Sequence, residues 1–196
     1  MEREVKPGMQ AIVSLLPSPV SQRVEELWDE LEARFGLNYI RITPFPHFTW
    51  QLADAYDDQE IIHLLHAFAL KQQPFHVLID GVDAFEAASP IVFLKVNQKP
   101  VLNCVHQRLW LELTPFAQQA NELYAPGTWS PHVTLALQDL GWDKYPEVMA
   151  FLREKELSWR IAVDNLTMLC QKGDGQAFIE SRFVFGQGLV ERNACG

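Results

Sequence analysis

One short pattern occurs twice in this chain, and it constrains the possible folds more than any other feature. Residues 46–50 (PHFTW) and 131–135 (PHVTL) both place a histidine and a threonine two positions apart in an apolar run. Side chains alternate between the faces of a β-strand, so each segment predicts a strand with one polar and one apolar face. The expected core-facing residues are Phe48, Trp50 and Leu52 in the first strand and Val133, Leu135 and Leu137 in the second.

The two segments hold equivalent places in a longer repeat. Residues 11–49 and 91–134 both run from an apolar strand through a proline-valine link and a helical stretch to the His-x-Thr strand. An internal duplication of this kind predicts two similar lobes related by a pseudo-dyad. We expect the lobes at roughly 9–85 and 90–185, within a single domain that spans residues 1–196.

Apolar periodicity predicts alternating strands and helices along the chain. Ser18 or Ser21 is the expected cap of the first helix, and Gly36 and Pro74 are the expected stops of the first two. The order predicts an α+β fold: two pseudo-symmetric lobes with antiparallel-rich sheets, helices packed outside, and the His-x-Thr strands lining a central cleft. The expected strands are 9–16, 47–53, 75–85 with a bend at Gly81, 91–96, 132–138, 158–171 and 177–185. The first expected helix follows its serine cap and ends at Phe35, and the others span 57–73, 100–123 with an interruption near Thr114-Pro115, and 144–155. A loose tail is expected after Gly188.

Composition narrows the classes of partner. The chain has 196 residues, of which 48% are hydrophobic, and a formal net charge of −9. An acidic surface repels long polyanions, although a local site for a small or terminal phosphate needs only a few donors. The three cysteines form no C-x-x-C pair, residues 1–10 carry no apolar signal segment, and no apolar run reaches the length of a membrane span. We expect a cytoplasmic protein that binds no membrane and no long nucleic acid.

The two histidines suit acid–base chemistry on a phosphodiester. Histidine titrates at a pKa of about 6.5, so near neutral pH one imidazole can accept a proton from water while another donates to the leaving oxygen. Threonine hydroxyls can donate hydrogen bonds to the nonbridging oxygens. The candidate catalytic residues are His47 and His132 and the candidate substrate-binding residues are Thr49 and Thr134, with no metal or other cofactor required.

Other histidines carry weaker signals. His63 and His66 have a helical spacing that can bind a metal, but no third ligand is evident from the sequence, so a helix-surface role is favoured. His76 and His106 have no motif partner, and a structural role is favoured for both.

Two further residues near the motifs have alternative interpretations. Trp129 precedes the second motif, and its ring is a candidate for stacking on a base, although a place in the core is favoured. Arg41 precedes the first motif and could reach a phosphate, and a surface role is equally compatible with its position.

Paired H-x-T motifs in a duplicated α/β chain of this length resemble the 2H phosphoesterase superfamily, and within it the 2'-5' RNA ligase-like or RNA 2',3'-cyclic phosphodiesterase group. The resemblance covers roughly 9–185, and residues 47–50 and 132–135 match its signature H-φ-T-φ, where φ is apolar. It implies a metal-independent enzyme that opens a 2',3'-cyclic phosphate to a 2'-phosphomonoester.

The resemblance also implies a partner, which is a small nucleotide or an RNA terminus that carries a cyclic phosphate, and we expect a monomer. Some members catalyse the reverse 2'-5' joining, but this acidic chain departs from the basic rim that a long RNA would need. Three alternatives remain: a non-catalytic nucleotide- or phosphate-binding module of the same fold, 2'-5' RNA ligase activity, and a structural protein in which the twin motifs are coincidental.

Overall fold

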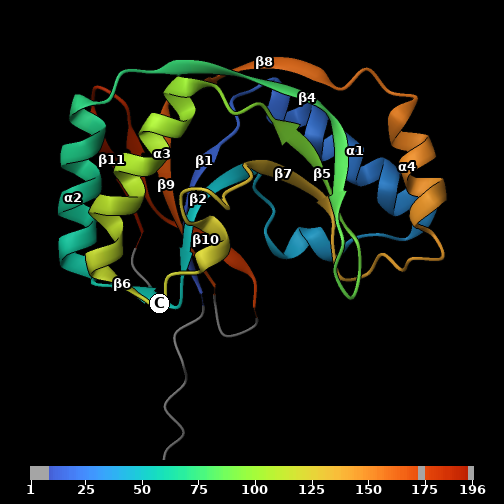
Figure 1. The fold of residues 1–196 in the computed structure, drawn as a ribbon, viewed down its shortest axis with the longest axis horizontal. Helices are drawn as coiled ribbons and strands as arrows, with labels where there is room; N and C mark the ends of the chain where they lie inside the picture. The colour runs from blue at the N-terminus through green and yellow to red at the C-terminus, as the bar shows by residue number, and fades with distance from the viewer. Residues whose placement is uncertain (1–8, 172–174, 194–196) are drawn as a thin grey trace, which may run out of the picture.

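Two antiparallel sheets lie side by side, and helices cover their outer sides (Figure 1). This computed structural model describes residues 9–171 and 175–193. The arrangement confirms the expected α+β class with antiparallel sheets and external helices.

The first sheet has five strands in the order β11-β10-β9-β1-β2, so β2, which carries the first His-x-Thr motif, is an edge strand. Its members are β1 (Gln10–Leu15), β2 (His47–Ala53), β9 (Asn165–Gln171), β10 (Ala177–Val184) and β11 (Gly188–Arg192).

The second sheet has four strands in the order β7-β5-β4-β8, and β7, which carries the second motif, is again an edge strand. Because β2 contacts β7, the two motif-bearing edges face each other at the centre of the molecule. The members of this sheet are β4 (Phe75–Phe85), β5 (Ile91–Val96), β7 (His132–Ala136) and β8 (Ser158–Val163).

The helices of the repeat exchange partners between the sheets. Helix α1 follows β1 but contacts β7, and α3 follows β5 but contacts β2, so each packs on the other sheet's motif strand (Figure 1). Within the described ranges, no helix has the length and apolar character needed to cross a bilayer. The helices and short elements are α1 (Val20–Phe35), α2 (Asp58–Lys71), α3 (Pro100–Leu113), α4 (Tyr145–Arg153), η1 (Tyr39–Ile42), η2 (Thr114–Phe116), η3 (Glu122–Tyr124) and the paired strands β3 (Ala55–Tyr56) and β6 (Ala117–Gln118).

The ends of α1 test the expected capping signals. Gly36 ends the helix in the left-handed region with φ 74°, and its N–H donates to the carbonyl oxygen of Glu32 at 2.9 Å, as its position predicted. The expected serine cap is wrong, because Pro19 occupies the N-cap position and no side chain caps the helix.

The two sheets do not follow the two halves of the chain, so the expected lobe limits of 9–85 and 90–185 are wrong as limits of the sheets. Strand β4 pairs with β5 and β8, whereas β9 and β10 return to the first sheet beside β1. The expected strand 158–171 is two strands, because the chain passes from one sheet to the other at Asp164. Residues 189–192 of the expected loose tail instead belong to β11, which pairs with β10, and residues 194–196 lie outside the described residues.

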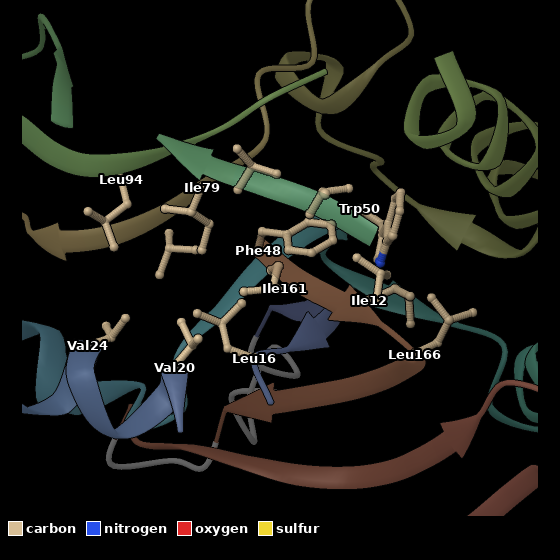
Figure 2. Packing of buried hydrophobic residues seen from close by; sticks show 14 of the residues in the cluster. Ile12, Leu16, Val20, Val24, Phe48, Trp50, Ile79, Leu94, Ile161 and Leu166 are labelled. Atoms are coloured by element: carbon tan, nitrogen blue, oxygen red, sulfur yellow. The ribbon is translucent and has the colours of Figure 1, made fainter. Parts of the chain in front are cut away.

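One hydrophobic core joins both sheets. Figure 2 shows Phe48 and Trp50 of β2 among apolar side chains from β4, β5, β8 and α1. Phe48 is 1% exposed and Trp50 is fully buried. Burial of each large apolar side chain contributes about 1.5–3 kcal/mol, so the apolar face of β2 holds the motif strand in place from behind.

A buried polar cluster secures the point where the chain crosses between the sheets. The side-chain amide of Asn165 accepts a hydrogen bond from the Leu15 N–H and donates one to the Leu15 carbonyl, both at 3.0 Å. This pair continues the β1–β9 ladder through a side chain. The Ser14 hydroxyl donates to the Asn165 carbonyl and accepts from the Trp50 indole, so the crossing is connected to the core behind β2.

We predict that Asn165→Ala destabilises the protein by about 2–4 kcal/mol, because each buried backbone group that loses its partner costs about 1–3 kcal/mol. Urea unfolding should measure the loss, with the exposed Asn97→Ala as the matched control. An Asn165 variant as stable as the Asn97 variant would contradict the role of this cluster.

Candidate active site

A β-bulge directly follows the motif threonine in β2. Thr49 pairs with Val13 of β1. The next pair is Gln51 with Ile12, so Trp50 is an extra residue with no partner opposite it. Bulges of this kind reverse the facing of the residues that follow and occur often beside active sites.

Strand β7 has a bulge at the equivalent position. Thr134 pairs with Phe93 of β5, and the next pair is Ala136 with Val92. Leu135, the residue after the threonine, is therefore the extra one. The two motif strands thus share a bulge as well as a sequence pattern.

The bulges correct one sequence expectation. We expected Leu52 and Leu137 to face the core with Phe48 and Val133, but both line the same cavity as the histidines. The expected alternation holds through the bulged residues Trp50 and Leu135, which face the core, and inverts after them.

The structure brings all four candidate site residues together. His47, Thr49, His132 and Thr134 line one cavity of about 240 Å³ between the two sheets. All four side chains are half-buried. Both imidazoles and both hydroxyls therefore border the same space.

Backbone carbonyls fix the tautomer of both histidines in the same way. Nδ1 of His47 lies 2.5 Å from the carbonyl oxygen of Phe45, and Nδ1 of His132 lies 2.7 Å from that of Ser130. A carbonyl oxygen only accepts, so each Nδ1 carries the proton and each Nε2 remains for chemistry. In both motifs the acceptor is two residues before the histidine.

Burial lowers the pKa of both histidines. For His47 desolvation is the largest cause, the hydrogen bond to Phe45 acts in the opposite direction, and the positive charge of His132 lowers the pKa further. For His132 desolvation lowers the pKa and the hydrogen bond to Ser130 raises it. Because the positive charge of His132 lowers the pKa of His47, the cavity disfavours two protonated imidazoles at once.

Two tryptophans hold the backbone of the motif strands. The Trp129 indole N–H donates to the Thr49 carbonyl at 2.9 Å, and the Trp28 indole N–H donates to the Thr134 carbonyl at 3.2 Å. Each indole comes from the repeat unit that does not contain the threonine it binds. We call this pair the crossed indole bonds. Because β2 and β7 are edge strands, these carbonyls need donors from outside their own sheets.

Tyr124, on η3, is a cavity residue that sequence reasoning missed. It lines the cavity with the histidines. Burial raises its pKa, and a hydrogen bond to the Thr49 side chain acts in the opposite direction. It lies in the irregular segment before β7, where no periodic pattern marks a functional position.

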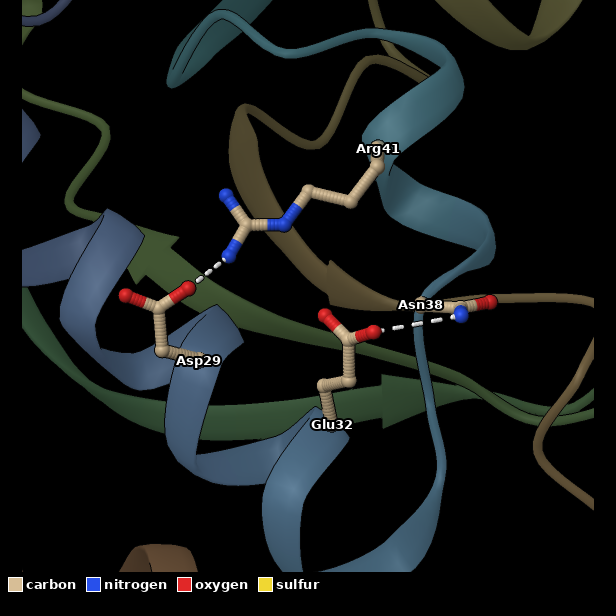
Figure 3. Close-up of polar contacts among 4 residues, drawn as sticks. All are labelled: Asp29, Glu32, Asn38 and Arg41. Carbon is tan, nitrogen blue, oxygen red and sulfur yellow. Dashed lines mark hydrogen bonds and ion pairs between the residues drawn. The ribbon is translucent and has the colours of Figure 1, made fainter.

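Arg41 faces a helix carboxylate. Its guanidinium pairs with Asp29 of α1 and lies 5.4 Å from the centre of the Trp28 ring. Figure 3 shows this pair beside the bond from the Asn38 amide to Glu32, which also joins the η1 segment to α1. Arg41 thus positions the segment that precedes the first motif.

His66, His106 and Trp129 have structural partners, whereas His63 and His76 are exposed. His66 accepts a hydrogen bond from the Leu189 N–H at 2.9 Å. His106 is 2% exposed and stacks on Trp129 at a ring separation of 3.8 Å. Among the described residues no cluster of three potential metal ligands occurs, and His63 and His66 therefore have no third ligand beside them.

A second cavity of about 400 Å³ adjoins the first. His132 and Tyr124 line both cavities. Trp129 also lines the second cavity, although the residue is only 6% exposed.

Comparison with known proteins identifies the family. The sequence profile of the 2'-5' RNA ligase superfamily matches residues 16–175, and the chain belongs to that superfamily. A protein of Bacillus cereus, provisionally named a phosphoesterase, is 25% identical over 171 residues, which cover 86% of this chain and 94% of the relative. A similarly named protein of Oceanobacillus iheyensis is 25% identical over 170 residues, 85% of this chain and 94% of its own.

Solved structures show the same fold. LigT of E. coli, solved in complex with 3'-AMP, matches with a TM-score of 0.57 and 18% identity over 91% of this chain and 98% of its own. A crystal structure described as a phosphoesterase matches with a TM-score of 0.54 and 17% identity over 95% of this chain and 97% of its own. These matches support the assignment of the two-sheet fold.

We predict that Trp129→Phe and Trp28→Phe each destabilise the protein by about 1–3 kcal/mol, because each removes the donor to a carbonyl on an inner edge strand while it keeps a large ring. Thermal or urea unfolding should measure both. Trp159→Phe on β8, outside both cavities, is the matched control. Equal stability of all three variants would show that the crossed indole bonds contribute nothing.

Proposed function

We propose that this protein is a phosphodiesterase that opens 2',3'-cyclic phosphates of nucleotides or RNA ends to 2'-phosphomonoesters, with His47 and His132 as its acid–base pair. The observation that carries the proposal is the matched geometry of the two histidines. Both present Nε2 to one cavity, both have Nδ1 bound to the carbonyl two residues earlier, and both stand beside a threonine.

The reaction needs one base and one acid. A water oxygen forms a bond to phosphorus and gives its proton to Nε2 of the neutral histidine. The bond from phosphorus to the ribose O3' breaks, and that oxygen takes a proton from Nε2 of the protonated histidine. The product is the 2'-phosphomonoester, and the two histidines have exchanged protonation states. A positively charged metal is not required for this transfer of protons.

We assign His47 as the base and His132 as the acid. Repulsion between the two positive charges favours a single proton on the pair, and His132 is proposed to carry it because this histidine also lines the second cavity, on the side proposed for the leaving group. The proton donated to the leaving oxygen then comes from His132, on the side of the first cavity that adjoins the second.

Thr49 and Thr134 are proposed to bind the nonbridging oxygens, where negative charge gathers in the transition state. The crossed indole bonds fix the backbone of both threonines, so the hydroxyls occupy defined positions before substrate binds. Such preorganisation is more effective than donors that must first be ordered.

The relatives support a phosphate ester as the substrate. Those in Bacillus cereus and Oceanobacillus iheyensis carry a phosphoesterase name. LigT has been solved with 3'-AMP and with ATP, so a protein of this fold binds nucleotides.

We predict that His47→Ala and His132→Ala each lower kcat on adenosine 2',3'-cyclic phosphate by roughly 10²–10⁴-fold, the usual contribution of one general acid or base. The double variant should be little slower than either single one, because the two groups act in one step. Formation of 2'-AMP in the presence of EDTA is the measurement.

The matched control is His63→Ala, because His63 is exposed on α2 and lines neither cavity. Full activity of either active-site variant would exclude the paired mechanism. Binding of 2'-AMP without any turnover by the unaltered protein would instead favour the binding-module alternative.

We predict a bell-shaped pH profile of kcat/KM with its maximum below about pH 6.5, the usual pKa of histidine. Burial lowers the pKa of both histidines, so the base is already deprotonated, and the acid already loses its proton, at lower pH than usual. The profile of kcat should be displaced to higher pH, because the negative phosphate raises both pKa values in the complex. A kcat/KM maximum above pH 8 would contradict this interpretation.

A further inference from the structure

A buried histidine outside both cavities connects the groups that bond to Thr49. His106 lies on α3, the helix that packs on β2, and is 2% exposed. It lines neither cavity, and the proposed proton transfers do not use it. Buried polar groups whose hydrogen bonds are satisfied make their surroundings rigid, so the contacts of this ring indicate what it holds in place.

The face of the His106 ring lies on Trp129. The two ring centroids are 3.8 Å apart and the ring planes differ by 5°. Trp129 in turn donates from its indole N–H to the Thr49 carbonyl at 2.9 Å. A stacked neighbour restricts how far the indole can tilt, so His106 preserves the direction of the donor that holds the Thr49 backbone.

The edge of the same ring holds Tyr124. Nε2 of His106 lies 3.0 Å from the Tyr124 carbonyl oxygen, and since a carbonyl only accepts, Nε2 carries the proton. Burial lowers the pKa of His106, while hydrogen bonds to the backbone of Tyr124 and Trp50 act in the opposite direction. The Tyr124 side chain hydrogen bonds to the Thr49 side chain. His106 is therefore linked to Thr49 through the backbone on one side and through the hydroxyl on the other.

A bound phosphate would fix the direction of the bond between Tyr124 and Thr49. Nonbridging phosphate oxygens only accept hydrogen bonds, so a Thr49 hydroxyl that donates to one of them accepts from Tyr124. Burial raises the pKa of Tyr124, which keeps its hydroxyl protonated and able to donate. A correctly placed Tyr124 therefore directs the Thr49 proton at the phosphate.

The second motif is held differently. Trp28, which donates to the Thr134 carbonyl, has the Arg41 guanidinium over its ring at 5.4 Å, and the Arg41 side chain is 34% exposed. Helix α1 contains no histidine. The two threonines are alike in sequence, but only Thr49 is joined to a buried hydrogen-bonding ring.

We propose that His106 is a positioning residue that holds Trp129 and Tyr124 so that the Thr49 hydroxyl donates to the phosphate. This proposal rests on the proposed function and distinguishes its two threonines. Thr49 is the donor that is oriented before substrate binds, and His106 acts on the reaction through Thr49 and not through Thr134.

Two variants separate the contacts of the ring. His106→Phe keeps a flat ring against Trp129 but removes the donor to the Tyr124 carbonyl, whereas His106→Gln keeps a donor. His106→Phe should lower kcat on adenosine 2',3'-cyclic phosphate by about 10–100-fold, a part of the roughly 10²–10³-fold contribution of one oxyanion donor, with little change in KM. His106→Gln should recover most of kcat. An unchanged kcat in His106→Phe, or no recovery in His106→Gln, would overturn the proposal.

A double-variant cycle tests the route through Thr49. In a Thr49→Ala background, His106→Phe should change kcat by no more than about twofold, because two groups that act as one are not additive. In a Thr134→Ala background it should keep its full effect. Equal effects in both backgrounds would indicate a general disturbance of the fold and would overturn the proposal.

Leu102→Val is the matched control for lost stability. Leu102 is fully buried on α3, one turn before His106, and lines neither cavity. This variant should lower the free energy of unfolding and leave kcat of the folded protein unchanged. A fall in kcat as large as that of His106→Phe would contradict a specific role for His106.

Calorimetry with 2'-AMP separates this proposal from the phosphodiesterase proposal. If the unaltered protein binds 2'-AMP without turnover, the phosphodiesterase proposal fails, but His106→Phe should still weaken binding by about 3–10-fold, a part of one hydrogen bond to a charged group. That weakening should vanish in a Thr49→Ala background. Equal weakening in both backgrounds would overturn the role of His106, and a protein that neither binds nor turns over these compounds would overturn both proposals.

Discussion

Two unpaired sheet edges face each other at the centre of this protein, and the rest of the structure depends on how they are kept open. Edge strands expose backbone donors and acceptors that tend to pair with any neighbouring strand. Here Trp129 and Trp28 occupy the carbonyls of Thr49 and Thr134. The crossed indole bonds thus satisfy one carbonyl on each edge, and both imidazoles line the cavity between the two edges.

The surroundings of the histidines disfavour protonation of both imidazoles at once, which suits the proposed chemistry. Burial disfavours the charged form of each imidazole, and a second positive charge nearby disfavours it further for His47. A pair that resists double protonation holds a single proton over a range of pH. In the proposed reaction, a negatively charged substrate stabilises that proton, which prepares the acid while the base remains free.

The sequence predicted which candidate residues lie together in one cavity better than it predicted the topology. His47 and His132 repeat with threonine at strand periodicity, and that pattern depends only on residues two positions apart, which the bulges at Trp50 and Leu135 do not disturb. Leu52 was misplaced because nothing in an apolar run marks where an extra residue enters the ladder. The crossing at Asp164 was missed for a similar reason: strands of both sheets are equally apolar, and the partner of a strand is set by contacts far away in the chain.

The exchange of helices and strands between the two sheets makes the duplicated units interlocked. Residues before the turn at Glu86 supply β1 and β2 to one sheet and β4 to the other, and the residues after it complete both. Neither half of the chain therefore contains a whole sheet or encloses its own core. The internal repeat can be recognised in the sequence, but the two repeat units fold only together. The unit that evolution can transfer to another protein is therefore the complete pair of repeat units.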